Sequence, residues 1–231
     1  MQRSIGKKGV FEATYVGSTT ENEVHAYALN QPKATVVTGT TPSVQARRPF
    51  NTYSTITFND GTGAARYKGL LTKYEQRLAG GLQLLGSYTF SKTTSNNEVS
   101  NQDPDNRAAD WGRTSFDTRH RFVASAIYAL PFKNLLARDW QFATITTLAA
   151  GNPFTPTMGF DNAGTGTTNN QRPNLTGDPN AGVHTPTLWF DPSLYSRPAA
   201  GTFGNAEPFS ITGPGANLQV QALRELERTF Q

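Results

Sequence analysis

The stretch GLQLLGSYTFS, residues 81–91, decides the fold of this chain. Apolar and aromatic side chains recur at every second position, at Leu82, Leu84, Tyr88 and Phe90. Most of the positions between them are polar, at Gln83, Ser87 and Thr89. A period of two residues is typical of a β-strand with two unlike faces. We therefore predict a strand over residues 81–91.

Similar alternation predicts five further strands. It recurs over residues 9–17, 66–78, 118–130 and 139–149. A last, weaker case covers residues 217–224, where the sequence could equally be helical. The chain is therefore predicted to be all-β, an antiparallel up-and-down meander of about six strands.

The predicted connections alternate between short and long. Only Ala-Gly-Gly separates Leu78 from Leu82, whereas the long loops cover residues 18–65, 92–117 and 151–216. Transmembrane β-barrels have this asymmetry, with short periplasmic turns and long extracellular loops. Strands near ten residues long also match a tilted crossing of the hydrocarbon layer. These features predict part of a transmembrane β-barrel with long extracellular loops.

The composition excludes several other classes of protein. The chain has 231 residues and no cysteine, so it has neither disulfides nor thiolate metal sites. Its longest apolar run is far below the roughly 18 residues of a membrane helix. The net charge of +4 is spread thinly, which argues against binding to nucleic acid. The first residues lack the apolar stretch of a signal peptide, so the chain is expected to begin inside a longer polypeptide.

The alternation assigns side chains to two candidate surfaces of the barrel. Lipid-facing residues are expected to be apolar, with aromatic girdles at both membrane interfaces. The lipid-facing candidates are Leu82, Leu84, Tyr88, Phe90, Phe122, Tyr128, Trp140 and Phe142. The lumen-facing candidates are Lys73, Glu75, Arg77, Gln83, Ser87 and Thr89.

A soluble or surface β-sandwich would also show alternating strands. Such a module would bind carbohydrate or protein through its loops. Loops of about 25 to 65 residues are unusual in a sandwich. Its inner faces would also carry more Val and Ile than these strands do. The pattern favours the barrel and leaves the sandwich as the alternative.

Short strings in family order resemble the TonB-dependent receptor-like outer-membrane proteins of the Oar-like group. The group carries an N-terminal carboxypeptidase-regulatory-like domain. The strongest string is residues 81–92, and the others are residues 13–18, 67–77, 102–110, 115–122, 151–154 and 201–205. The resemblance covers residues 2 to 216 and implies a piece of a barrel of about 22 strands.

What the resemblance implies is transport of a substrate across the bacterial outer membrane. Complete members combine the barrel with a plug domain and an energising complex of the inner membrane. This chain is expected to contact outer-membrane lipid and to need the remaining barrel and the plug, which it lacks. Residues 216–231 match the group weakly, so the chain is expected to be an internal or C-terminal piece. A truncated gene and an excerpt both stay open.

Candidate chemistry is sparse, and we expect no enzyme activity, cofactor or metal site. Asp117, Arg119, His120 and Arg121 are expected to lie where a loop becomes a strand. Alternation would place His120 on the face opposite Arg119 and Arg121, with Arg119 pairing with Asp117 or Asp110.

Two further loop segments carry notable side chains. Asp103 and Asp105 offer hard oxygen ligands for calcium, but a turn stabilised by their side chains is favoured. The three histidines lack the spacing of metal ligands. Residues 161–174 have the composition of a solvated loop, not of a packed core.

Overall fold

The structure is a computed structural model that describes residues 1–131, 141–182, 184–185 and 187–215. Six of its strands make up the main path of one antiparallel sheet, in the order β1-β2-β3-β4-β6-β7. Their bounds are β1 (Gln2–Ile5), β2 (Gly9–Ala28), β3 (Thr57–Ala79), β4 (Leu82–Ser95), β6 (His120–Ala129) and β7 (Gln141–Ala149). The predicted all-β, antiparallel meander is confirmed.

The remaining elements are short and belong to the loops. Strand β5 (Gly112–Arg113) pairs with β4. Two small sheets pair β8 (Pro153–Phe154) with β11 (Ile211–Thr212), and β9 (Asn174–Leu175) with β10 (Tyr195–Ser196). Single 3₁₀ turns are η1 (Gln45–Arg47), η2 (Arg107–Asp110) and η3 (Pro192–Leu194). No helix in the described ranges is long and apolar enough to cross a membrane.

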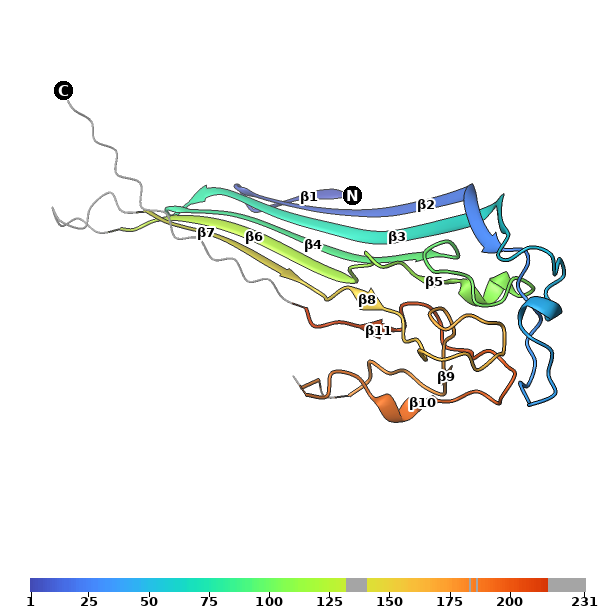
Figure 1. The fold of residues 1–231 in the computed structure, drawn as a ribbon. Helices are drawn as coiled ribbons and strands as arrows, with labels where there is room; N and C mark the ends of the chain where they lie inside the picture. The colour runs from blue at the N-terminus through green and yellow to red at the C-terminus, as the bar shows by residue number, and fades with distance from the viewer. Residues whose placement is uncertain (132–140, 183, 186, 216–231) are drawn as a thin grey trace, which may run out of the picture.

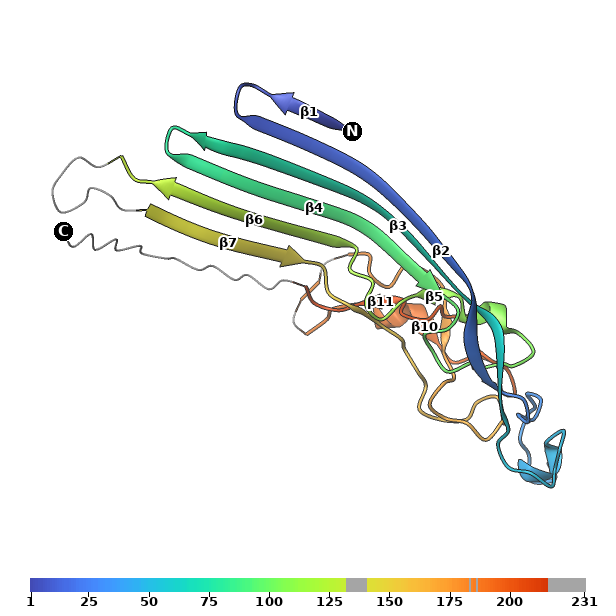
Figure 2. The same ribbon diagram turned by 90° about the horizontal axis from the view of Figure 1, so that it is seen from above.

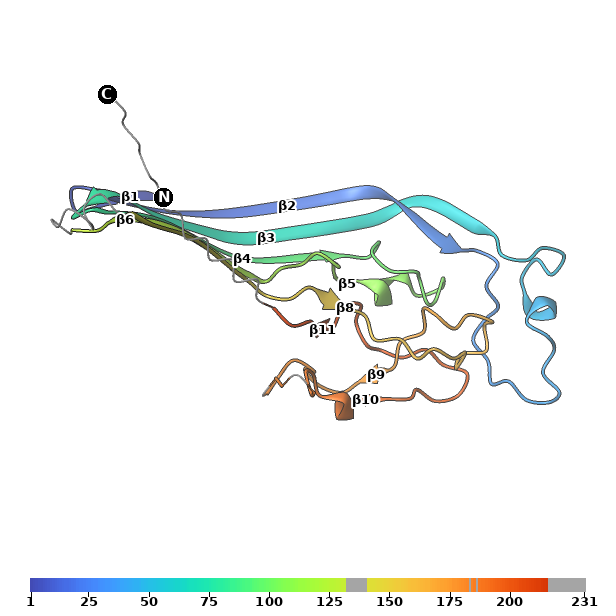
Figure 3. The ribbon, with the colours of Figure 1, turned by 60° about the vertical axis from the view of Figure 1, so that its left-hand side comes forward.

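The sheet is a single curved layer, and the loops gather at one of its ends. Figure 1 shows β8 to β11 below the sheet, close to its loop end. Seen from above, the strands lie side by side in chain order (Figure 2). The connection between β2 and β3 reaches farthest from the sheet (Figure 3). The tight turns between β1 and β2 and between β3 and β4 lie at the opposite end.

The hairpin of β2 and β3 is longer than predicted. Its register runs from Gly9 opposite Gln76 to Ala28 opposite Thr57. The predicted strands 9–17 and 66–78 are therefore too short, and the predicted loop 18–65 shrinks to residues 29–56. The added part is mostly exposed on both of its faces, so it lacks the apolar alternation that marks a half-buried strand.

Irregular pairing is a second reason why the sequence pattern does not predict this added part of the hairpin. The register shifts between Thr20 and Glu23 and again between Glu23 and His25. Asn22, which lies between them, has a left-handed backbone with φ of 60°. Extra residues of this kind bend a strand and increase its twist. Each shift also resets the period of two on which the sequence prediction depends.

Other strand bounds differ less. Strand β4 extends the predicted strand 81–91 to Ser95, and β6 is slightly shorter than the predicted strand 118–130. Strand β1 was not predicted. The loops predicted over residues 92–117 and 151–216 contain β5 and β8 to β11. The predicted strand 139–149 is β7 from Gln141 onward, and the predicted strand 217–224 lies outside the described residues.

Glycines make the tight turn between β3 and β4. Gly80 and Gly81 both have left-handed backbones, with φ of 60° and 83°. A Cβ atom on Gly81 would also lie 2.9 Å from the carbonyl oxygen of Ala129. Only glycine adopts this backbone without strain, so the Ala-Gly-Gly string fixes the turn at this point of the chain.

The register of the long hairpin can be tested by cross-linking, because the chain has no cysteine. Ala26 lies directly opposite Asn59, and both side chains are exposed. Ala26→Cys with Asn59→Cys should form a disulfide under mild oxidation, since opposite Cβ atoms lie about 5 Å apart. Electrophoresis under non-reducing conditions detects the bond. Equal cross-linking of Ala26→Cys with Phe58→Cys, whose side chains point to opposite faces, would contradict the register.

Candidate functional site

The cross-strand register groups the lipid-facing candidates on one face of the sheet. Tyr88 lies opposite Thr72 on one side and Phe122 on the other. Residues directly opposite each other share a face, and every second residue along each strand joins them. We call this surface the apolar face. Of the candidates it holds Leu82, Leu84, Tyr88, Phe90, Phe122, Tyr128 and Phe142, whereas Trp140 lies outside the described residues.

The lumen-facing candidates occupy the other surface, which we call the polar face. Lys73 lies opposite both Glu12 and Ser87, and Ser87 lies opposite Val123. Glu75, Gln83 and Thr89 share this face by the same register. Arg77 follows the last regular pair of β3, and its Nε lies 3.7 Å from a Glu75 carboxylate oxygen. The structure separates the two sets, and their assignment to lipid and lumen stays a prediction.

Charge distinguishes the two faces at the middle of the sheet. On the apolar face no charged side chain occurs on β3 between Leu70 and Gln76, or on β4 between Leu82 and Phe90. On the polar face, the same level carries Glu12, Lys73 and Glu75. A charged side chain on the lipid face of a barrel costs about 2–4 kcal/mol at the midplane. On β3 and β4 the distribution of charge therefore favours the apolar face for contact with lipid, whereas Arg3 of β1, opposite Phe11, lies on this face as well.

On β4, β6 and β7 the aromatic residues of the apolar face form two levels, whereas Phe11 of β2 and Tyr74 of β3 are paired between these levels. Tyr88 and Phe122 are paired at one level, and Tyr128 and Phe142 at the other. Between them lie small side chains such as Ala124. The two levels are about 20 Å apart along β6. Phe90 and Phe142 are 42% and 47% exposed, so no second sheet within the described residues covers them as a sandwich would require.

The loops form a body whose centre is polar. The Arg172 guanidinium lies 2.7 Å from an Asp110 carboxylate oxygen, and these side chains are 1% and 0% exposed. Arg172 also donates to the carbonyl oxygens of Ala206 and Ala109, at 2.8 and 3.0 Å. Burial raises the pKa of the Asp110 carboxyl, and Arg172 opposes that shift. Arg172, which precedes β9, therefore joins η2 to Ala206, which follows β10.

A buried glutamine organises the stretch that the sequence predicted to be solvated. The Gln171 Oε1 atom accepts hydrogen bonds from the backbone N–H groups of Asn162 and Ala163, both at 2.9 Å. Its Nε2 donates to the Asp161 carboxylate at 2.7 Å. The prediction of a solvated loop over residues 161–174 is therefore wrong. Side-chain amides here satisfy buried backbone groups, and such packing leaves no apolar pattern in the sequence.

The cluster around the start of β6 also differs from expectation. Asp117 accepts a hydrogen bond from Arg113 at 2.6 Å, and Asp110 pairs with Arg172. The predicted pairing of Arg119 with Asp117 or Asp110 is therefore wrong. Arg119 precedes β6, so strand alternation does not govern its direction. Its guanidinium carbon lies 6.0 Å from the Phe90 ring centroid.

His120 takes part in an aromatic contact and in no catalytic arrangement that the structure shows. Its Nδ1 lies 2.7 Å from the Tyr88 hydroxyl, and its ring lies 5.0 Å from that of Phe90. Arg121 lies on the opposite face, as predicted, because it pairs with Thr89. Within the described residues, no group of three or more His, Cys, Asp or Glu side chains could hold a metal ion. The Asp103 carboxylate accepts the backbone N–H of Asp105 at 3.0 Å, which makes a local turn.

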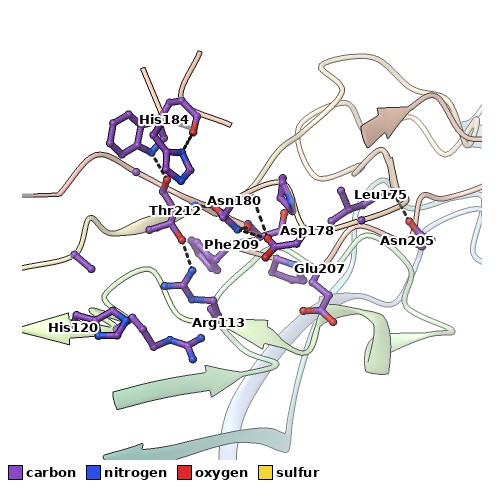
Figure 4. A pocket seen from close by; sticks show the side chains of 18 residues that line it. Arg113, His120, Leu175, Asp178, Asn180, His184, Asn205, Glu207, Phe209 and Thr212 are labelled. Carbon is purple, nitrogen blue, oxygen red and sulfur yellow. Dashed lines mark hydrogen bonds between the residues drawn. The ribbon is translucent and has the colours of Figure 1, made fainter. Parts of the chain in front are cut away.

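A cleft of about 810 Å³ separates the end of the sheet from the loop body. This volume lies within the range of small-molecule sites. Arg113, Arg119 and His120 line it from the sheet side, and Asp178, Glu207 and Trp189 line it from the loops. In Figure 4, Arg113 points toward Thr212, and Asp178 and Glu207 lie near the centre of the view. The sequence missed this cleft because its loop side comes from residues 175–213, which have no strand periodicity.

One ion pair connects the loop end of the long hairpin to η2. Arg107 lies 2.7 Å from an Asp60 carboxylate oxygen and also stacks on the Tyr27 ring at 4.4 Å. Hydrogen bonds from the Thr62 side chain and from Arg107 lower the pKa of Asp60 from 3.8 to about 2. The carboxylate is therefore the form that the fold stabilises.

Comparison with known proteins gives one match. A family model described as an outer membrane beta barrel domain matches residues 1–225. The matched range includes the whole main sheet and the loop body. No curated protein and no solved structure matches the chain.

The buried Arg172–Asp110 pair should dominate the stability of the loop body. Arg172→Ala leaves a buried carboxylate without its partner, a change that costs about 3–5 kcal/mol in other proteins. Hydrogen exchange of the backbone amides of residues 101–110 should speed up accordingly. Arg3→Ala, an exposed arginine of β1, is the control and should change stability by less than about 0.5 kcal/mol. Unchanged exchange in Arg172→Ala would contradict a structural role for the pair.

The Asp60–Arg107 pair predicts a definite pH window. Because the pKa of Asp60 is lowered on folding, the carboxylate stabilises the fold above pH 3.8. That stabilisation is lost as the pH falls through about 2. Pepsin cleavage within residues 57–64, followed between pH 4 and pH 2, should therefore increase only toward the lower end. Asp60→Asn should abolish the dependence, and the same increase in Asp60→Asn as in the wild type would count against this pair.

Proposed function

Because this chain belongs to the outer membrane beta barrel domain family and so to the bacterial outer membrane, we propose that it forms part of the wall of a TonB-dependent receptor. In this role the chain separates lipid from a hydrated lumen through which a substrate crosses the membrane. The chain itself carries out no chemical reaction and uses no cofactor. The resemblance of residues 2–216 to the Oar-like group supports this finer assignment.

The observation that carries the proposal is the difference between the two faces of the sheet. A wall between lipid and water needs an apolar band on one side and polar side chains on the other. On β3 and β4 the apolar face has no charge at its middle, while Glu12, Lys73 and Glu75 occupy the polar face. Arg3 of β1, opposite Phe11, is a charge that the edge strand adds to the apolar face. The exposure of Phe90 and Phe142 argues against the sandwich alternative.

The two edges of the sheet need further strands to pair with their backbone groups. Strands β1 and β7 are the outermost strands of the described sheet. An unpaired backbone group in lipid costs several kcal/mol, and the smallest bacterial barrels have about eight strands. The proposed partners of this chain are therefore lipid and the remaining strands of the barrel, and the resemblance to the Oar-like group adds the plug domain. Energy for transport would come from an inner-membrane complex, and nucleic acid has no part in the proposal.

The cleft at the loop end suits a first contact with the substrate. It lies where the loops meet the ends of β6 and β7, through His120 and Ala150. Its charged and aromatic side chains come from both the sheet and the loops. A substrate held there would lie at the outer end of the wall.

Labelling of single cysteines tests the proposal, because the chain has none of its own. Ala124 and Ser125 are neighbours on β6 that point to the apolar and polar faces. In outer membranes that contain the complete barrel, a water-soluble maleimide should modify Ser125→Cys and spare Ala124→Cys. If transport is energised, movement of the plug should raise the labelling of Ser125→Cys, and a protonophore should reverse the increase.

Two results would contradict separate parts of the proposal. Equal labelling of Ala124→Cys and Ser125→Cys would refute a wall with one lipid face and one lumen face. Labelling that is selective for Ser125→Cys, but indifferent to the protonophore, would refute the dependence on TonB. The barrel assignment would survive the second result.

A further inference from the structure

Two lysines face each other across the sheet. Lys68 of β3 lies directly opposite Lys92 of β4, on the apolar face. Both side chains are exposed. Directly opposite residues have Cβ atoms about 5 Å apart, and like charges at such positions destabilise a sheet. An anion between the two ammonium groups would remove this repulsion.

No carboxylate of the described residues neutralises these lysines. The ion pairs there involve Lys73, Arg77, Arg107, Arg113 and Arg172. Asp117 accepts the backbone N–H of Thr93, next to Lys92, but its carboxylate is bound to Arg113. The pair of lysines therefore remains an uncompensated centre of positive charge.

A third cation extends the patch. Arg66 is two residues from Lys68 on the same strand, so it lies on the same face. Its guanidinium lies 4.9 Å from the centroid of the Trp111 ring, and the group is exposed. We call Arg66, Lys68 and Lys92 the basic row.

The basic row lies directly beyond the apolar band. The next pair along the two strands on the same face is Leu70 with Phe90, followed by Thr72 with Tyr88. Cationic side chains just outside an aromatic level are characteristic of the membrane–water interface, where they extend toward the headgroups. The row also lies at the loop end of the sheet, which is the outer end of an outer-membrane barrel.

We propose that the basic row binds the phosphate group of an anionic lipid headgroup in the outer leaflet. Lys68 and Lys92 hold the phosphate between them, and Arg66 contacts it from the side. The acyl chains then lie along Leu70, Phe90 and Tyr88. This inference rests on the proposed function, because it requires the apolar face to meet lipid.

Short-chain phosphatidylglycerol is the probe for this site, with short-chain phosphatidylcholine as its zwitterionic counterpart. Native mass spectrometry of the complete barrel that contains this chain, purified in detergent, measures the affinity for each lipid. The wild type should prefer phosphatidylglycerol. The double variant Lys68→Gln with Lys92→Gln should lose roughly 30-fold in affinity for it, since each cation near an anionic surface contributes about 1 kcal/mol. Lys68→Arg with Lys92→Arg should keep the preference.

The matched control is Lys73→Gln, a lysine of the same strand on the opposite face. It should leave the preference for phosphatidylglycerol unchanged. A preference that persists in the Lys68→Gln, Lys92→Gln variant would overturn the proposal, as would an equal loss in Lys73→Gln. Displacement of the lipid by inorganic phosphate at equal concentration would show a general anion site and overturn the lipid assignment.

This outcome is separable from that of the proposed function. Labelling of Ala124→Cys by the water-soluble maleimide would show that the apolar face does not contact lipid. That result would refute both proposals. Protection of Ala124→Cys, together with no selective loss in the Lys68→Gln, Lys92→Gln variant, would refute the basic row alone. The maleimide pattern, repeated in the double variant, also shows whether that variant has folded.

Discussion

The hydrogen-bonded ladder of β2, β3, β4, β6 and β7 is the constraint on which the rest of the structure depends. In hydrocarbon no water is present to bind a backbone N–H or C=O group, so each must find a partner in a neighbouring strand. Antiparallel pairing satisfies them and, at the same time, fixes the register from Gly9 opposite Gln76 to Arg121 opposite Ala149. The register in turn decides which side chains share a face. The apolar face, the polar face and the basic row are all consequences of one set of backbone bonds.

The loop body is stabilised by different interactions. Within the described residues, only three hydrophobic residues count as buried: Ala163, Ala206 and Ile211. Buried polar side chains are far more numerous, and Arg172, Gln171 and Asp110 connect segments distant in the chain. The interior of the loop body is stabilised by hydrogen bonds and ion pairs, because each buried polar group needs a hydrogen-bond partner. The positions of these partners fix the arrangement of the loops. Such an interior suits loops that face water and must nevertheless present a cleft of fixed shape.

The sequence predicted the strands in which apolar and polar residues alternate along the chain. Residues 81–91 alternate because one face is apolar and the other polar, and this contrast was enough to predict the faces of Leu84 and Ser87. It was not enough for residues 18–28, where both faces meet water and irregular pairing resets the period. Nor could it find the Gln171 network or the Arg113–Asp117 pair, because such contacts join polar side chains whose positions depend on the folded loops. The cleft escaped prediction for the same reason.

The long hairpin of β2 and β3 has a consequence for the position of the loop body. Beyond the basic row, about nine residues of each strand continue to Ala28 and Thr57, in six directly opposed pairs, over a length of about 30 Å. A ladder of hydrogen bonds holds this extension, so its tip stands at a set height above the lipid. Residues 29–56 are thereby held at the far end of the hairpin, where Thr35 and Arg47 bond to Ala163 and Gly164 of the loop body. The hairpin therefore also sets how far the loop body extends from the sheet.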